Sequence, residues 1–359
     1  MMVKKEINVQ ILLFEDDELE SEKIKKRLKS LVDESTDIKD IIREELMEVE
    51  QYHERVSALD DYIKSNNIGL VILDQEITKY AGRYVSPADI TQLCKLSGIP
   101  LLAYSNNESD MIDRIKKWGE RRILIDEVLD PEEIATFAAN IFNGFKLLSD
   151  GYTGFREGSN KNPFDILFEV MKAPESSHTQ IKLYATGYFD VMPENDEIEE
   201  EMKKHFPTLL GYWIYNSLFR FPGVLLNEVA AASYLGIDEE KYSKNEEIRN
   251  LFAEALYTGP LGELRKYWWK DKLDTLLAEA EIEDEFPGLI YLKKNEITDV
   301  NPVKCSHDGE EGAGYYCIIS SKPVCDDHSE GNISWLPSGA SLSRISHKVM
   351  DKLGPWYPL

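Results

Sequence analysis

Short apolar runs that each end in a polar residue alternate with amphipathic helical stretches over the first 150 residues. The runs are too short for core helices and are typical of buried strands. They lie at residues 8–14, 46–52, 69–73, 99–104 and 123–125. Helical apolar spacing is found at residues 19–31, 55–65, 86–96, 111–118 and 130–142. Because strands that alternate with helices form parallel sheets covered on both faces, we expect an α/β domain, a doubly wound (βα)5 sheet.

The carboxyl ends of the expected strands carry acidic and hydroxyl side chains. These residues are Glu15, Asp16, Asp74, Ser105, Asp126 and Glu127. In doubly wound sheets the carboxyl ends of the strands face one crevice, which is where ligands bind. Several carboxylates in one crevice repel one another, so they need a divalent cation or raised pKa values. We therefore expect an acidic pocket that can hold Mg²⁺ between Glu15, Asp16 and Asp74.

The order of these motifs resembles the receiver domains of bacterial two-component response regulators, over residues 7–147. The fragments that carry the resemblance are ILLFEDDE at 11–18, LVILD at 70–74, PLLAYS at 100–105 and DPEE at 130–133. The resemblance implies that Glu15 and Asp16 are the metal-binding pair and that Asp74 is the phospho-acceptor. It also implies that Ser105 is the switch hydroxyl at the end of the fourth strand.

The sequence departs from the receiver pattern where the family has a lysine followed by a cis-proline. By spacing from Asp130, these positions fall on Glu127 and Val128. A glutamate there would repel an aspartyl phosphate rather than hold it. Two interpretations follow: a phosphorylated switch at Asp74, or a degenerate receiver fold kept as a docking surface. The second is favoured, and in it the acidic pocket can still bind Mg²⁺.

The composition changes after residue 145, and a segment at 149–163 rich in Gly, Ser and Asn indicates a boundary. We expect domains at 1–148, 149–300 and 301–359, the second mainly helical (α+β) and the third a small Cys/His element packed on it. A strand is expected within 180–191. Helices are expected at 209–219, 225–235, 246–257, 261–269, 273–280 and 342–353.

Trp268 and Trp269 lie among basic residues. A site for nucleobases or an anionic peptide is one interpretation of this pair. Packing of a tryptophan in the core is the favoured one.

Three of the four cysteines and two of the six histidines gather near the C-terminal end, in the pattern C-x-H-x9-C-x7-C-x2-H. The residues are Cys305, His307, Cys317, Cys325 and His328. Thiolates and imidazoles are the ligands of structural zinc, which takes four of them. Our preferred set is Cys305, Cys317, Cys325 and His328, with His307 as a substitute or outer group. The alternatives are a buried cysteine pair with exposed histidines, a disulfide, or a catalytic metal or thiol.

The charge balance, 41 Lys and Arg against 66 Asp and Glu for a net charge of −25, limits the class of partner. It argues against binding to nucleic-acid backbones and to anionic membranes. No apolar run reaches the length of about 18 residues that spans a bilayer. The first residues lack the pattern of a signal peptide, so a cytoplasmic protein is expected.

We therefore expect a non-enzymatic regulatory component of a bacterial signalling or phage-defence (antiviral) system, whose partner is another protein. It would combine a pseudo-receiver domain with a zinc-stabilised C-terminal region. One alternative is a phosphorylatable response regulator with Asp74 as acceptor and a C-terminal effector. Others are a metalloenzyme at the Cys/His cluster and a protein whose acidic surface mimics DNA.

Overall fold

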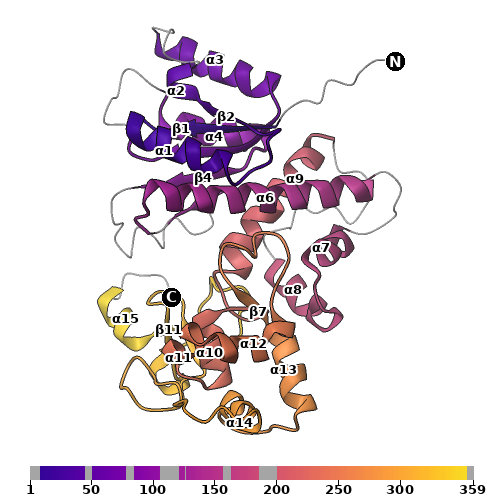
Figure 1. Cartoon of the computed structure of the whole chain (residues 1–359), viewed down its shortest axis with the longest axis vertical. Coiled ribbons are helices and arrows are strands. Elements are labelled where there is room, and N and C mark those ends of the chain that lie inside the picture. The colour runs from indigo at the N-terminus through magenta and orange to yellow at the C-terminus, as the bar shows by residue number, and fades with distance from the viewer. Residues whose placement is uncertain are drawn as a thin grey trace. The chain divides into compact units, whose positions relative to one another are not determined.

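The computed structural model divides the chain into two compact units (Figure 1). It describes residues 9–44, 51–77, 85–105, 121–125, 127–156, 163–185 and 200–353. Unit 1 comprises residues 1–159 and 195–212, and unit 2 comprises residues 160–194 and 213–359. The sequence-based division at 148 and 300 differs in two ways. Residues 195–212 belong with the first unit, and the Cys/His region shares the second unit with the helices before it.

Unit 1 contains the expected parallel sheet. Its strands are β1 (Gln10–Phe14), β2 (Asp37–Asp40), β3 (Ile68–Asp74), β4 (Leu101–Tyr104) and β5 (Ile123–Leu124). They are arranged in the order β2-β1-β3-β4-β5, and every neighbouring pair is parallel. This is the flavodoxin-like doubly wound order, in which the strand sequence reverses between β1 and β3. The α/β class and the parallel sheet are therefore confirmed.

The second strand of the sheet is not where the sequence suggested. The strand of the sheet that follows β1 in the chain is β2 at Asp37–Asp40, and Tyr52, at the end of the strand expected at 46–52, begins a helix. Residues 45–50 are outside the described part of the chain. Among the described strands β2 pairs with β1 alone, so it is an edge strand of the described sheet, where alternating polar residues are tolerated. Only Ile38 and Asp40 of β2 are buried. The strand therefore has one buried apolar residue, and its sequence does not show the apolar run by which the other strands were predicted.

Side-chain caps mark the beginning of several helices of unit 1. The described helices are α1 (Glu18–Lys29), α2 (Ile41–Glu44), α3 (Tyr52–Ser65), α4 (Pro87–Ser97), α6 (Pro131–Arg156) and most of α9 (Glu200–Trp213). The Asp17 side chain accepts hydrogen bonds from the first turn of α1, and Ser86 does the same for α4. Such caps satisfy backbone N–H groups that have no partner within the helix. The helix expected at 111–118 lies outside the described residues.

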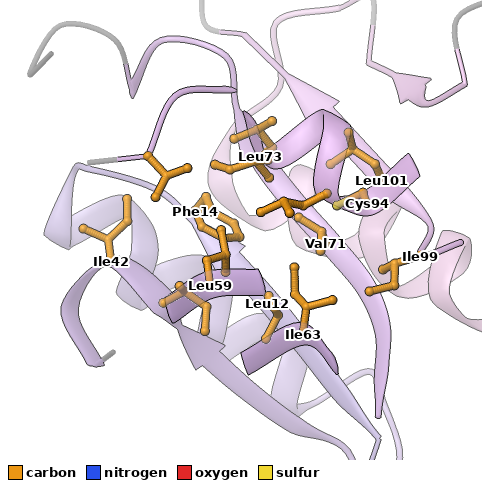
Figure 2. Close-up of a cluster of buried hydrophobic side chains, with 14 of the residues drawn as sticks. Leu12, Phe14, Ile42, Leu59, Ile63, Val71, Leu73, Cys94, Ile99 and Leu101 are labelled. Carbon is orange, nitrogen blue, oxygen red and sulfur yellow. The ribbon is translucent and has the colours of Figure 1, made fainter. Parts of the chain in front are cut away.

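Apolar side chains from both faces of the sheet are buried under helices. Figure 2 shows one cluster, where Leu12, Val71 and Leu73 of the strands meet Leu59 and Ile63 of α3. Alternation along a strand turns the residues between them to the opposite face, and α6 packs against β3. An added Cβ at Gly69 would lie 2.6 Å from the Phe142 ring of α6. A side chain at Gly69 would therefore push α6 away from the sheet.

Unit 2 has, over its described residues, two small sheets among many short helices. Its helices are α7 (Pro163–Met171), η2 (Glu175–Ser177), α8 (His178–Ala185), η3 (Ile214–Leu218), α10 (Glu228–Leu235), α11 (Glu239–Lys244), α12 (Glu246–Leu251), η4 (Ala253–Ala255), α13 (Lys270–Glu279), α14 (Pro287–Lys294), η5 (Asp326–His328) and α15 (His347–Leu353). Its strands are β6 (Leu225–Asn227), β7 (Tyr267–Trp269), β8 (Tyr315–Cys317), β9 (Lys322–Val324), β10 (Ser329–Glu330) and β11 (Ser343–Ser346). The strand orders are β6-β7 and β10-β11-β8-β9.

Several expected elements of unit 2 are wrong in type. The strand expected within 180–191 is helical up to residue 185 as α8, and the end of the expected helix at 261–269 is β7. The expected helices at 225–235 and 342–353 each begin with a strand, β6 and β11. In each case the segment that differs is short, and tertiary packing decides its conformation.

Trp268 and Trp269 are in β7 and are both 1% exposed. Trp268 packs against Tyr242, and Trp269 packs edge-on against Tyr257. The favoured reading of this pair, a packing role in the core, is confirmed.

No helix among the described residues has the length and apolar character needed to cross a bilayer.

The cluster in Figure 2 predicts where unit 1 is sensitive to mutation. Leu73 is fully buried, so Leu73→Ala should lower the free energy of unfolding of unit 1 by about 2–5 kcal/mol. The matched control is Leu147→Ala on α6, because Leu147 is 56% exposed and its loss should cost under about 0.5 kcal/mol. Hydrogen exchange of β1 and β3 peptides in urea measures both. Equal effects of the two variants would contradict the described core.

Candidate functional site

The strand register places two acidic residues side by side at the carboxyl edge of the unit 1 sheet. Phe14 of β1 pairs with Leu73 of β3, so the residues that follow them, Glu15 and Asp74, are neighbours. Both are almost fully buried, at 1% and 3% exposed. Because β1 and β3 flank the point where the strand order reverses, this edge is where doubly wound sheets bind ligands.

Three carboxylates meet at this edge and form what we call the acidic pocket: Glu15, Asp16 and Asp74. One oxygen of each lies within 4.8 Å of the others. The next residue, Asp17, caps α1 by accepting from Leu19 N and Glu20 N. In the acidic run, Asp17 therefore caps the helix, whereas Glu15 and Asp16 belong to the acidic pocket. Oxygen ligands at such separations suit a hard divalent cation such as Mg²⁺, so the predicted pocket residues are together.

Glu15 is the most perturbed carboxyl of the pocket. Burial raises its pKa from 4.5 to about 7, and the negative charges of Asp74 and Glu20 act in the same direction. Two hydrogen bonds oppose the rise: Tyr104 Oη donates to Oε2, and Asp17 N donates to Oε1 over 2.8 Å. A buried carboxyl with a pKa near 7 is partly protonated at neutral pH, and it would lose this proton when a cation binds.

Tyr104, the last residue of β4, is a pocket residue that the sequence reasoning missed. Its side chain is 1% exposed, and its hydroxyl contacts Glu15. Burial and the charge of Glu15 raise the pKa of the Tyr104 hydroxyl, so it acts as a donor. The available signal was a tyrosine at the end of an otherwise aliphatic buried strand, where a phenol needs a partner.

Ser105, the predicted switch residue, is held by the loop that follows β3. Its Oγ donates to Glu76 Oε1 over 3.0 Å, and Glu76 N donates to Asp74 Oδ1 over 2.9 Å. Glu76 therefore connects the hydroxyl of Ser105 to the carboxylate of Asp74. Glu127, the other predicted switch position, follows β5 and is exposed, as is Val128. Asp126 lies outside the described residues.

Cysteine and histidine side chains of unit 2 form a second group, and Cys317, one of the predicted zinc ligands, is not part of it. Atoms of Cys305, Cys325 and His328 lie within 4.8 Å of one another. His307 stacks on the ring of His328, with centroids 4.3 Å apart. Cys317 is separate: it is buried in β8, and its Sγ accepts from Ser346 N over 3.3 Å. All four cysteines are free thiols.

No family model matches this chain, and no curated protein matches it either. Function must therefore be argued from the two groups of side chains.

The burial of Glu15 predicts a pH dependence for the metal-free protein. Between pH 4.5 and 7 the folded state binds more protons at Glu15 than the unfolded state does, so stability falls as the pH rises through this window. Above pH 7 the penalty reaches about 3 kcal/mol. Glu15→Gln keeps an acceptor for Asp17 N and removes the charge, so it should be more stable than the wild type at pH 8.

Urea unfolding of unit 1 from pH 4.5 to 8, without divalent cations, measures this difference. Glu132→Gln on α6, an exposed acid, is the control and should keep the wild-type pH slope. An unchanged slope in Glu15→Gln would contradict the assignment to Glu15.

Proposed function

We propose that unit 1 is a regulatory module that binds Mg²⁺ in the acidic pocket and acts by contact with another protein, without phosphotransfer. The observation that carries the proposal is the meeting of Glu15, Asp16 and Asp74 at the carboxyl edge of the parallel sheet. Three carboxylates that close repel one another strongly in a buried site. A divalent cation removes that repulsion and uses their oxygens as ligands.

The resemblance to receiver domains supports a regulatory role, since its acidic pair and acceptor position fall on these three residues. Two features favour a module that does not switch by phosphorylation. Ser105 donates to Glu76, so its hydroxyl already has a negatively charged acceptor. Glu127 stands where receivers have the lysine that neutralises an aspartyl phosphate, and its charge has the wrong sign for that role.

A second candidate function is a response regulator that is phosphorylated on Asp74. The observation in its favour is the position of Asp74, at the end of β3 and within 4.8 Å of the two other pocket carboxylates. A metal bound there would lie next to the carboxylate oxygens of Asp74, the proposed phospho-acceptor. The cellular setting expected from the sequence, a bacterial signalling or phage-defence assembly, is part of the same proposal and rests on analogy.

A phosphodonor distinguishes the two candidates. We expect that acetyl phosphate with Mg²⁺ leaves the intact mass of the protein unchanged, because Glu127 and the Ser105–Glu76 hydrogen bond disfavour an aspartyl phosphate. Intact-mass spectrometry under mild conditions is the measurement. A gain of one phosphoryl group that disappears in Asp74→Asn would overturn the proposal in favour of the response regulator.

Magnesium binding is tested by its effect on the stability of unit 1. A ligand of the folded state at 100 times its Kd raises the free energy of unfolding by about 2.7 kcal/mol, so Mg²⁺ should slow hydrogen exchange in β1 and β3. Asp74→Asn should lose this protection, since it removes one of three charges from the pocket. Glu132→Gln should retain it. Equal protection of Asp74→Asn and wild type would refute the acidic pocket as the magnesium site.

A further inference from the structure

The Cys/His group of unit 2 is assembled from two short backbone segments. Cys305 lies in a turn closed by Cys305 N to Glu310 O at 2.8 Å and Gly309 N to Cys305 O at 2.8 Å. Gly309 has a φ of +84°, a conformation that side chains other than glycine rarely adopt. Cys325 follows β9, and His328 ends the single turn η5. Ser306 N donates to Pro323 O over 3.0 Å, which ties the two segments together.

The atoms of the group converge on His328 Nδ1. Cys325 Sγ lies 3.1 Å from this nitrogen, and Asp308 Oδ2 also lies 3.1 Å from it. Cys305 Sγ accepts from Cys325 N over 3.4 Å, which orients the second thiol toward the first. For comparison, the ligands of a tetrahedral zinc ion, bound at about 2.0–2.3 Å, are separated by about 3.3–3.8 Å.

A single hydrogen at His328 Nδ1 cannot form a well-aligned bond with both neighbours. An imidazole Nδ1 carries at most one hydrogen, yet a sulfur and a carboxylate oxygen both approach it. A cation located between the sulfur, oxygen and nitrogen lone pairs would satisfy all of them. The mixture of two thiols with an imidazole selects zinc over the hard cations that suit the acidic pocket.

The fourth ligand follows from the orientation of the rings. His307 and His328 are parallel to within 5°, and a bound metal lies in the plane of the imidazole that holds it. An ion in the plane of His328 is therefore out of the plane of His307, so His307 is a stacking neighbour. Asp308 is better oriented: its Oδ1 accepts from Glu310 N over 3.0 Å, which directs Oδ2 to His328.

We propose that Cys305, Cys325, His328 and Asp308 bind one structural zinc ion. His307 holds the His328 ring by stacking, and Cys317 takes no part. Both thiols lose their protons to solvent when the ion binds. The ion would join the turn that contains Cys305 to the end of β9, two segments separated by about twenty residues of sequence. The strands β8 and β9 are short. A metal link between these segments would add stability that a larger apolar core supplies in other folds.

The first test uses the full-length wild-type protein. Metal analysis should find one zinc per chain, and X-ray absorption should find two sulfur and two nitrogen or oxygen neighbours. Cobalt that replaces the zinc should give the intense visible bands of tetrahedral coordination, unchanged by added azide. A third sulfur neighbour would overturn the ligand set. A disulfide between Cys305 and Cys325 without zinc, or a cobalt spectrum that azide alters, would overturn the closed structural site.

Variants then assign the ligands. Cys305→Ser and His328→Ala should reduce bound zinc to traces, whereas Cys317→Ser and Cys94→Ser should keep one ion per chain. Cys94, buried in α4 of unit 1, is the matched thiol control. Asp308→Asn should lower zinc affinity by about 10–100-fold, and His307→Gln by less. Loss of zinc in Cys317→Ser, or a larger effect of His307→Gln than of Asp308→Asn, would contradict the assignment.

Discussion

Helices cover both faces of the parallel sheet in unit 1, and this constraint decides where polar chemistry is placed. Strands that are buried on both faces must be apolar along their whole length. Their polar residues are therefore displaced to the strand ends, and parallel strands bring these ends to one edge. Phe14 and Leu73 pair in the sheet, so the strand register alone makes Glu15 and Asp74 neighbours. The acidic pocket is a direct consequence of the way in which the sheet is covered.

The same constraint explains which strands the sequence could predict. β1, β3 and β4 are interior strands, and their unbroken apolar runs were recognised with nearly correct ends. β2 is an edge strand with the sequence DIKD, and it was missed because one apolar residue between charges has no distinctive pattern. Tyr104 was missed for another reason. Its ring belongs to the apolar run, and only the fold shows that its hydroxyl reaches Glu15.

Unit 2 was harder to predict because its elements are short. A segment of three residues, such as β7 at Tyr267–Trp269, has no period that distinguishes strand from helix. The Cys/His pattern identified the region of the candidate metal site but not its members. Cys317 and Cys325 look alike in sequence, yet one is buried in a strand beneath Ser346 and the other faces His328. Asp308 was passed over because nothing in its spacing distinguishes it from the acids beside it.

The two groups of side chains share one feature, since each brings several possible metal ligands close together. They differ in how protons compete with a metal for these ligands. Burial raises the pKa of Glu15 to about 7, so near neutral pH a proton competes with a cation in the acidic pocket. Such competition would make cation binding depend on pH near neutrality, which suits the proposed regulatory role. At the Cys/His group both thiols must lose their protons before a metal binds, but zinc forms strong bonds to thiolates. Occupancy there is expected to be lasting, which suits a structural role.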